Sequence, residues 1–479
     1  ITSPQVHFGL GEMANADVVR VVWQNGYVQG EFDLKSDQTV AAEQRLKGSC
    51  PHLFAWDGEK FAHVKDAPPW SPALGLKINA QDTYGILQTE EWFKIPGEAL
   101  KPKEGFYELR ITGEYWESFY LDNYKLLAVD HAENVETFTD ERFSIPLPPL
   151  KVFMTETTKP FANATDHNGR DVLETVAQLD EKYLDGIKRG KFQGVAEDHF
   201  VELELPADAP RDKKLWVVAD GWMHPTDASI NVQRGQVTDV KPPKSLSIEV
   251  EHENGTWKTV KENLGFPAGK MKTVLLDLSD VFTKDAKRRR LRIRTELEVF
   301  WDKLAWAVDL DNVDNRTKML DLTEANLRYR GFSLIEKRDD SSPEIPNYYK
   351  ILTTNQRWRD LEGYYTRFGD VRELLLNTDD RIVLMNSGDE LVLKFPSLPE
   401  VEKGMKRDFV IIGNGWIKDG DLNSVFSKTL LPLPTQKSND YSRRPTNLED
   451  DPVYQRNKQD WVNFHTRYVS PTQFRDALR

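Results

Sequence analysis

The sequence predicts a mostly β protein, made of tandem antiparallel β-sandwich or jelly-roll modules with one or two short helices. Aromatic residues are plentiful, with 13 Trp, 15 Tyr and 23 Phe, and aromatic side chains dominate the cores of sandwiches. Apolar or alternating segments recur behind Gly and Pro along all 479 residues, a pattern that favours sandwiches over helical bundles. A chain of this length has room for about two to four domains, each with its own core.

The first predicted module is a β segment over residues 1–45. Residues 6–11 read VHFGLG and form a glycine turn, and residues 18–29 read VVRVVWQNGYVQ, a β-rich run with an Asn-Gly hairpin signal. Together they resemble the ASPIC/UnbV domain, which closes bacterial secreted proteins with FG-GAP (VCBS-type) repeats and the animal cartilage acidic protein. The stretches 50–58 and 358–375 resemble the β-rich tail of larger bacterial members of that family. The resemblance implies a secreted or cell-surface protein, and we expect an upstream part to precede Ile1.

Repeated strand pairs predict how the following modules are built. Three strands close on a proline, at 91–96, 201–206 and 391–396, and each precedes a second strand that runs into a tryptophan, at 106–113, 215–221 and 409–413. Proline marks the end or edge of a strand because it cannot donate to a β ladder. We interpret the pairs as repeated hairpins, the first of which belongs to a β-sandwich module over residues 46–150.

The middle of the chain is predicted to be a linker followed by a jelly roll. Residues 145–150 read IPLPPL and force an extended backbone. Residues 151–192 form a linker with an amphipathic helix over 169–190, where apolar residues recur at helical spacing. Strands at 246–250, 272–278 and 290–295, with a turn at 254–257, give residues 200–310 a resemblance to a galactose-binding-like (discoidin-type) jelly roll, the module predicted over 193–325. The resemblance implies two antiparallel sheets, ligand loops at one rim and often a structural calcium. Residues 326–479 are predicted to be a C-terminal β module with an extended tail, in which residues 454–464 form a short helix.

Charge and cysteine content exclude several classes of protein. The formal net charge of −13 opposes binding to nucleic acid and to anionic membranes, and no stretch approaches the roughly 18 apolar residues of a membrane helix. The basic run 287–290 leads into an alternating strand, so we interpret it as a solvated strand face, with a polyanion contact as the alternative. Cys50 is the only cysteine, which excludes an intrachain disulfide and metal sites built on several cysteines.

Catalytic signatures are missing from the sequence. It contains no Gly-x-Ser-x-Gly, no His-Glu-x-x-His and no glycine-rich phosphate loop. A pair of carboxylates for glycoside hydrolysis cannot be judged from sequence distance. We therefore expect a protein that is not an enzyme, with a surface glycosidase as a minor alternative.

Oxygen-rich loops are the candidates for a structural Ca²⁺ ion. Asp419, Asp421 and Asn423 lie at i, i+2 and i+4, as at the start of a calcium loop, although the residues that follow depart from an EF-hand and leave a polar turn as the alternative. Asp309 and Asp311 form a second, similar loop.

Three Asn-x-Ser/Thr sequons are candidate glycosylation sites. Their acceptors would be Asn163, Asn254 and Asn315.

Aromatic residues near loops are the candidates for binding a ligand, since sugar rings stack on exposed Trp and Tyr. The candidates are Tyr115 with Trp116, Trp222 with His224, and Trp257, which follows an Asn-Gly turn and is the one most expected at a rim. Core packing is the stronger interpretation for most of them.

These observations predict a non-catalytic extracellular or cell-surface protein that binds or scaffolds. Its partners would be carbohydrate or another extracellular protein, met by loops of the sandwiches, with no nucleic acid and no membrane insertion. One alternative is a structural subunit of an extracellular assembly or filament, built by self-association. Another is the accessory region of a surface glycosidase.

Overall fold

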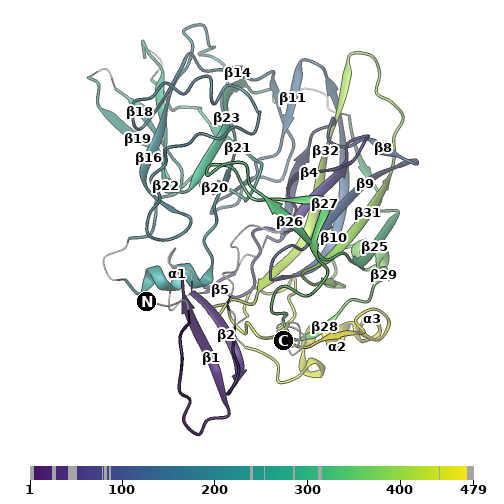
Figure 1. The fold of residues 1–479 in the computed structure, drawn as a ribbon. Helices are drawn as coiled ribbons and strands as arrows, with labels where there is room; N and C mark the ends of the chain where they lie inside the picture. The colour runs from purple at the N-terminus through teal and green to yellow at the C-terminus, as the bar shows by residue number, and fades with distance from the viewer. Residues whose placement is uncertain are drawn as a thin grey trace.

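The fold was analysed in a computed structural model, which describes residues 5–23, 28–40, 42, 51–77, 79, 83–85, 88–237, 241–252, 254–283, 286–310, 316–441 and 443–471. Two β-sandwiches form the body of the molecule and lie side by side (Figure 1). Every ladder between strands of the described part is antiparallel. The predicted fold class, mostly β with antiparallel sandwich modules, is confirmed.

The first sandwich consists of a five-stranded and a seven-stranded sheet. The five-stranded sheet has the order β24 (Arg316–Leu320), β10 (Glu117–Ala132), β32 (Met405–Asp419), β7 (Glu90–Ile95), with β30 (Val383–Met385) also on β10. The seven-stranded sheet has the order β29 (Gly369–Asp370), β25 (Glu324–Tyr329), β31 (Asp389–Pro396), β9 (Phe106–Thr112), β3 (His52–Trp56), β4 (Phe61–Asp66), with β8 (Pro102–Lys103) on β9. Leu109 and Leu391 of one sheet and Phe119 and Ile411 of the other are fully buried in a shared core, as expected for two sheets packed face to face.

The second sandwich pairs a four-stranded with a five-stranded sheet. The first has the order β14 (Lys159–Pro160), β23 (Val299–Val308), β17 (Leu215–Met223), β21 (Lys272–Asp277), and the second β15 (Asn163–Asp166), β16 (Val195–Glu204), β22 (Arg290–Leu297), β18 (Ser247–Glu251), β19 (Trp257–Lys261). Val217 and Leu276 of the four-stranded sheet meet Leu203 and Ile293 of the other in one core. Strand β22 alternates half-buried and buried residues along its whole length, which leaves the outer face of its sheet open to solvent.

Smaller elements surround the sandwiches. The two-stranded pairs are β1 (Asn15–Val22) with β2 (Val28–Lys35), β5 (Leu76–Lys77) with β6 (Thr83–Tyr84), β11 (Val135–Phe138) with β13 (Phe153–Glu156), β12 (Arg142–Phe143) with β20 (Phe266–Pro267), β26 (Phe332–Glu336) with β27 (Ile345–Thr353), and β28 (Gly363–Tyr365) with β33 (Arg467–Val469). The helices are α1 (Ala228–Gly235), α2 (Pro452–Arg456) and α3 (Lys458–Asn463), with 3₁₀ turns η1 (Arg372–Leu375) and η2 (Leu448–Asp450). The described part thus has three short α-helices where one or two were predicted, and none of them is long and apolar enough to span a membrane.

The predicted division into modules needs correction. Residues 46–150 and 326–479 are not separate modules, because β31 of the later segment pairs with β9 and β32 pairs with both β10 and β7. The second sandwich does not match 193–325 either. It takes in β14 and β15 before residue 193, and β24 near its predicted end belongs to the first sandwich. The second sandwich is therefore inserted into the first.

The helix predicted over residues 169–190 is wrong. That segment holds no helix and lies along β23, where the Leu184 N–H donates to the carbonyl of Trp301 at 2.7 Å and the Leu304 N–H to that of Val176 at 2.8 Å. Val172, Val176 and Leu184 of the apolar set are buried in the second core, whereas Leu179 is exposed. Backbone bonds to the strand replaced the helical ones, since tertiary contacts override local preference. The predicted short helix over 454–464 corresponds to the end of α2 and the whole of α3, two helices in place of one.

The three repeated strand pairs are not hairpins. Strands β16 and β17 lie in opposite sheets of the second sandwich. Strands β7 and β9 lie in opposite sheets of the first sandwich, and so do β31 and β32. The proline at the end of each first strand therefore marks the point where the chain leaves one sheet for the facing one.

The N-terminal β segment forms the hairpin β1–β2, which projects from the body beside α1 (Figure 1). Its Asn25-Gly26 turn lies outside the described residues. In the part of β2 next to the turn, Gln29, Glu31 and Phe32 are buried. Gly30 faces Leu422, and a Cβ added at Gly30 would lie 3.0 Å from the Leu422 Cβ. The hairpin is thus anchored by the turn that follows β32.

Candidate functional site

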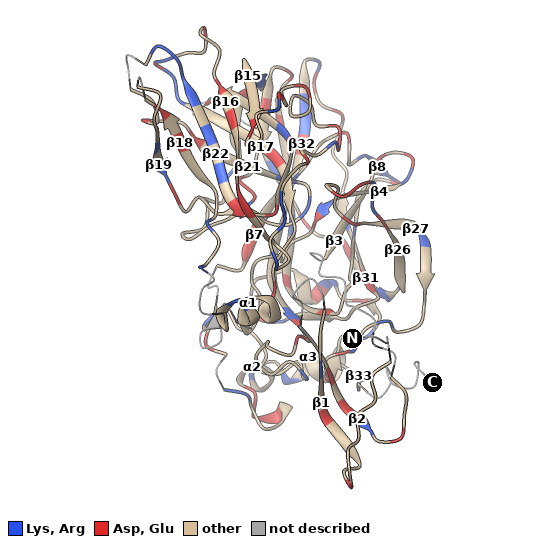
Figure 2. Cartoon of the chain, turned by 60° about the vertical axis from the view of Figure 1, so that its left-hand side comes forward, with Lys and Arg blue, Asp and Glu red and all other residues tan. Residues whose placement is uncertain are grey.

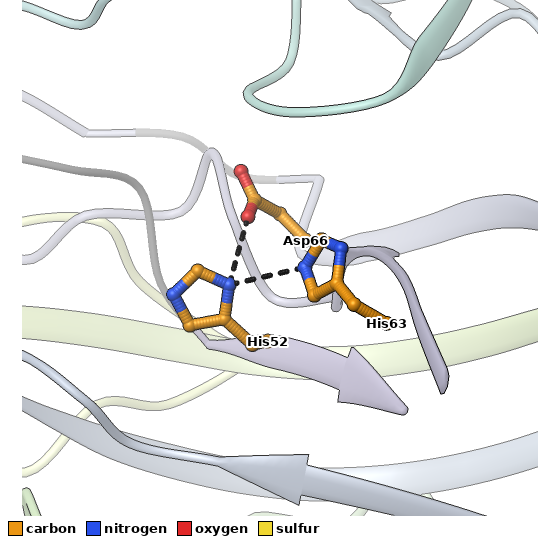
Figure 3. Close-up of side chains that lie close together, drawn as sticks. All are labelled: His52, His63 and Asp66. Carbon is orange, nitrogen blue, oxygen red and sulfur yellow. Dashed lines mark hydrogen bonds and ion pairs between the residues drawn. The ribbon is translucent and has the colours of Figure 1, made fainter. Parts of the chain in front are cut away.

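Two histidines and an aspartate lie together on the β3–β4 hairpin (Figure 3). The register pairs His52 with Asp66, then shifts between Leu53 and Phe54, so that Phe54 pairs with His63. In a regular strand residues 63 and 66 would point to opposite faces, but the one-residue bulge turns both toward His52. His52 Nδ1 lies 3.3 Å from His63 Nε2 and 3.4 Å from Asp66 Oδ1.

Asp66 is held by the second sandwich. Its Oδ2 accepts a hydrogen bond from the Lys270 backbone N–H at 2.7 Å, and its carbonyl accepts one from Lys272 Nζ at 2.7 Å. The Lys270 ammonium lies 3.8 Å from Asp66 Oδ1. We call this contact region between β4 and the start of β21 the junction.

Both histidines of the cluster are neutral at physiological pH. Burial, followed by the nearby Lys270 ammonium, holds the pKa of His52 well below its usual range and lowers the pKa of His63 to about 3. A neutral imidazole keeps a lone pair on one ring nitrogen. The cluster can therefore serve as a hydrogen-bonded polar knot or as a set of metal ligands.

A buried ion pair forms the second part of the junction. The Glu141 carboxylate accepts from Lys65 Nζ at 2.7 and 2.8 Å, from the Lys94 N–H at 2.7 Å and from the Thr273 N–H of β21 at 3.1 Å. Burial lowers the pKa of the adjacent Lys272 to about 7, which the Glu141 carboxylate partly offsets. The junction is thus polar, buried and hydrogen-bonded.

Tyr115 and Trp116 are not a ligand platform. Both are buried, at 0% and 3% exposure, and Trp116 packs edge-on against Trp358 with ring centroids 5.7 Å apart. The Tyr115 ring lies 5.8 Å from the His52 ring and 5.8 Å from Lys270 Nζ. These aromatics fill the core and wall off the histidine cluster, as the core-packing interpretation expected.

Trp222 and His224 do not form an open rim either. Trp222 is 1% exposed and stacks on Phe300 at 4.9 Å, and its indole N–H donates to the carbonyl of Ser341 at 2.8 Å. His224 is half-buried with its Nδ1 3.2 Å from the Glu298 carboxylate. Trp222 thus joins the second sandwich to the loop between β26 and β27, to which Ser341 belongs.

Trp257 is half-buried, like His224, and lies on the outer face of the β16-β22-β18-β19 sheet. Figure 2 shows basic residues repeating along β22 beside acidic residues on β16. The Arg292 guanidinium lies 3.8 Å from the centre of the Trp257 ring and 4.1 Å from that of Phe200. Arg292 also pairs with Glu202 at 3.1 Å. We call this surface the arginine face.

Acidic partners balance the arginines of this face. Arg290 pairs with Glu251 at 2.7 Å and also with Glu202. Arg294 pairs with Glu249 at 3.0 Å and also with Asp198. The solvated strand face predicted after the basic run is found on β22, where its charges are paired across strands. Within the run 287–290 only Arg290 belongs to this face, because Arg289 is buried and its guanidinium donates to the carbonyls of Pro206, Ala209 and Pro210.

The first calcium loop is engaged by the protein itself. Asp421 is fully buried and its Oδ1 accepts from the Ser229 hydroxyl of α1. Asp419 Oδ1 accepts from the Asp421 N–H at 2.9 Å, and Asn423 Nδ2 donates to the Ser229 hydroxyl at 3.1 Å. These hydrogen bonds dock α1 on the loop, and Ca²⁺ binding there stays a prediction.

The remaining predicted sites are placed as follows. The Asp309 carboxylate pairs with Lys214 Nζ at 3.3 Å, while Asp311 and Asn315 lie outside the described residues. Asn163, at the start of β15, and Asn254 are both exposed.

The histidine cluster was missed by sequence reasoning. Its signal was the Asp57-Gly58 turn between two apolar runs, since Asp57 Oδ1 accepts from the N–H groups of Glu59 and Lys60 at 2.8 Å and sets the hairpin. Pairing outward from that turn brings residues near 52 opposite residues near 65. The bulge that aligns His63 with Asp66 had no sequence signal.

The described chain is a two-sandwich β protein with an N-terminal hairpin and a polar junction. Residues 2–47 match the model of the family described as ASPIC and UnbV, which supports the resemblance drawn from the first 45 residues. No curated protein matches the chain.

Two solved structures of infectious bursal disease virus are among those similar to the chain. The Gx strain structure shares 8% identity, covers 97% of this chain and 85% of its own, and has a TM-score of 0.13. The Gt strain structure shares 9% identity, covers 92% and 96%, and has a TM-score of 0.11. Likeness at this level carries no argument about fold or function.

Proposed function

We propose that this protein is a non-catalytic binding or scaffolding protein of the extracellular space or cell surface, and that it binds carbohydrate on the arginine face. The observation that carries the proposal is the layer formed by Phe200, Arg292 and Trp257 on an open sheet. The resemblance of residues 2–47 to the ASPIC and UnbV family supports the extracellular setting.

The chemistry of the arginine face suits a neutral polyol better than a polyanion. Sugar hydroxyls both donate and accept hydrogen bonds, and the paired guanidinium and carboxylate groups provide fixed donors beside fixed acceptors. A polyanion would meet as many acidic as basic groups, because the arginines are already paired with Glu202, Glu249 and Glu251. Aromatic edges add apolar surface for the faces of sugar rings.

The architecture of the second sandwich adds support. Two facing antiparallel sheets are what a galactose-binding-like jelly roll requires, although here the candidate ligand surface is the face of a sheet. The predicted loop residues Tyr115, Trp116 and Trp222 are buried. The binding surface therefore moves from the rim to the arginine face.

A glycan array with the purified chain tests this proposal. Binding of one glycan class, lost at least tenfold in Trp257→Ala and in Arg292→Ala, is the expected result. Tyr364→Ala, which removes a 42% exposed aromatic residue on β28, outside the second sandwich, is the control and should bind normally. A blank array for the folded chain, or equal binding by all variants, would refute the proposal.

Two further measurements address the alternative functions. Size-exclusion chromatography showing no monomer at micromolar concentration would favour a structural subunit of an assembly. Turnover of chromogenic glycosides would favour a glycosidase and would overturn the non-catalytic assignment.

A further inference from the structure

We propose that His52, His63 and Asp66 bind one divalent transition-metal ion of the zinc class, at the base of the β3–β4 hairpin beside the junction. Among the described residues, this is the one group of three His, Cys, Asp or Glu side chains whose ligand atoms lie within 4.8 Å of one another. The proposal is independent of carbohydrate binding on the arginine face.

The separations within the cluster fit metal ligation better than hydrogen bonding. Hydrogen bonds from a ring N–H usually span about 2.7–3.2 Å, whereas His52 Nδ1 lies 3.3 Å from His63 Nε2 and 3.4 Å from Asp66 Oδ1. Ligands bound to zinc at about 2.0–2.1 Å in a tetrahedron stand roughly 3.3–3.4 Å apart. His52 Nδ1 lies at that spacing from both other atoms, and all ligand atoms of the group lie within 4.8 Å of one another, as at three corners of such a site (Figure 3).

The types of ligand also fit a zinc-class ion. Imidazole nitrogen and carboxylate oxygen suit Zn²⁺ and its neighbours, and a site with three protein ligands leaves a fourth position for water. The remaining oxygen of Asp66, Oδ2, is fixed by the Lys270 N–H at 2.7 Å. Such an outer hydrogen bond orients a ligating carboxylate.

The Lys270 ammonium tunes the affinity of this site. At 3.8 Å from Asp66 Oδ1 it is beyond hydrogen-bonding distance of that oxygen. It nevertheless repels a nearby cation through a buried medium. We therefore expect moderate affinity in the natural protein and tighter binding when this charge is removed.

A bound ion would stabilise the contact between the two sandwiches. His52 and His63 belong to the first sandwich, and Asp66 is bonded to Lys270 and Lys272 of the second. An ion bound to Asp66 would hold this residue in place, and with it the hydrogen bonds that Asp66 forms with Lys270 and Lys272. A ligand that binds only the folded form raises stability by mass action.

Titration of the full chain with Zn²⁺ and with Co²⁺ tests the proposal. The expected results are one bound equivalent, a higher melting temperature with Zn²⁺, and the visible absorption of tetrahedral Co²⁺. His63→Gln and Asp66→Asn should each weaken metal binding at least ~10–100-fold, because mutating even a residue that only hydrogen-bonds to a metal ligand lowers metal affinity by that much. Lys270→Met should bind Zn²⁺ at least roughly tenfold more tightly, because the repelling ammonium is removed.

The controls separate this site from unspecific binding. His131→Gln removes a buried histidine that faces a single carboxylate, Asp408, at 3.3 Å, and it should leave the stoichiometry and the Co²⁺ spectrum unchanged. Circular dichroism confirms that each variant is folded. Absence of binding by the natural chain, an unchanged Co²⁺ spectrum in folded His63→Gln, or unchanged affinity in folded Lys270→Met would overturn the proposal.

Discussion

The ion pair between Lys65 and Glu141 offers a direct measure of how strongly the junction stabilises the molecule. Lys65→Met removes the ammonium and leaves the Glu141 carboxylate, whose side chain is 0% exposed, without its cationic partner. Breaking a buried pair in this way costs about 3–5 kcal/mol. The backbone donors Lys94 and Thr273 remain at 2.7 and 3.1 Å, so we expect the lower end, about 3 kcal/mol.

The assay is urea denaturation followed by tryptophan fluorescence, with calorimetry to identify which sandwich melts. A loss of about 3 kcal/mol corresponds to roughly 6–12 °C in the melting temperature of a domain of about 150–250 residues. The double variant Lys65→Met/Glu141→Gln removes both charges and should recover about 1–3 kcal/mol relative to the sum of the single changes. Lys350→Met, which breaks the exposed pair with Glu336, is the control and should cost less than about 1 kcal/mol. A single-variant cost below about 1 kcal/mol, or strictly additive effects, would refute the reasoning.

Two further predictions concern packing and pH. In Gly97→Ala the added Cβ would lie 1.8 Å from the carbonyl oxygen of Arg407, so we expect the free energy of unfolding to fall by about 3 kcal/mol in urea denaturation. The control Gly9→Ala, whose added Cβ would have nothing within 4 Å, should leave stability unchanged. Equal stability of the two variants would contradict the packing around Gly97. Burial lowers the pKa of folded His63 to about 3, so the unfolded chain takes up this proton near pH 6.5 and stability falls as the pH drops from about 6.5 toward 3. Between pH 7 and 4.5 the natural chain should therefore lose about 2 kcal/mol relative to His63→Gln in denaturation at each pH, and a constant difference would contradict a buried neutral His63.

The sequence predicted local strand character well and strand pairing poorly. The alternation over residues 290–295 placed Leu291 and Ile293 inward and the arginines outward, as observed. The repeated strand pairs predict hairpins, but each pair joins opposite sheets. Local alternation fixes which side of a strand is buried, whereas the choice of partner depends on contacts hundreds of residues away, such as β9 with β31.

The candidate sites show the same difference between what local sequence sets and what distant contacts set. Trp257 follows an Asn-Gly turn and stays half-buried on the outer face of its sheet, because local sequence sets that position. Trp222 looked similar in sequence, yet its indole reaches the carbonyl of Ser341, 119 residues away, at 2.8 Å. The histidine cluster depends on a bulge in β4 and on Lys270 from the other sandwich, and neither has a local signature.

The inserted topology also predicts the order of folding. The two ends of the second sandwich meet, since Thr155 bridges Asp309 and the Leu310 N–H donates to the carbonyl of Met154 at 2.9 Å. When the second sandwich has formed, the loop that must close before β10 can pair with β24 shrinks from about 180 to about 30 residues, which lowers the entropic cost by about 1.5 kcal/mol. We therefore expect the second sandwich to form first, so that in pulse-labelling hydrogen exchange during refolding the amides of β17 and β23 are protected before those of β24 and β32. Earlier protection of β24 and β32 would refute this order, because the first sandwich would then have closed the long loop without help.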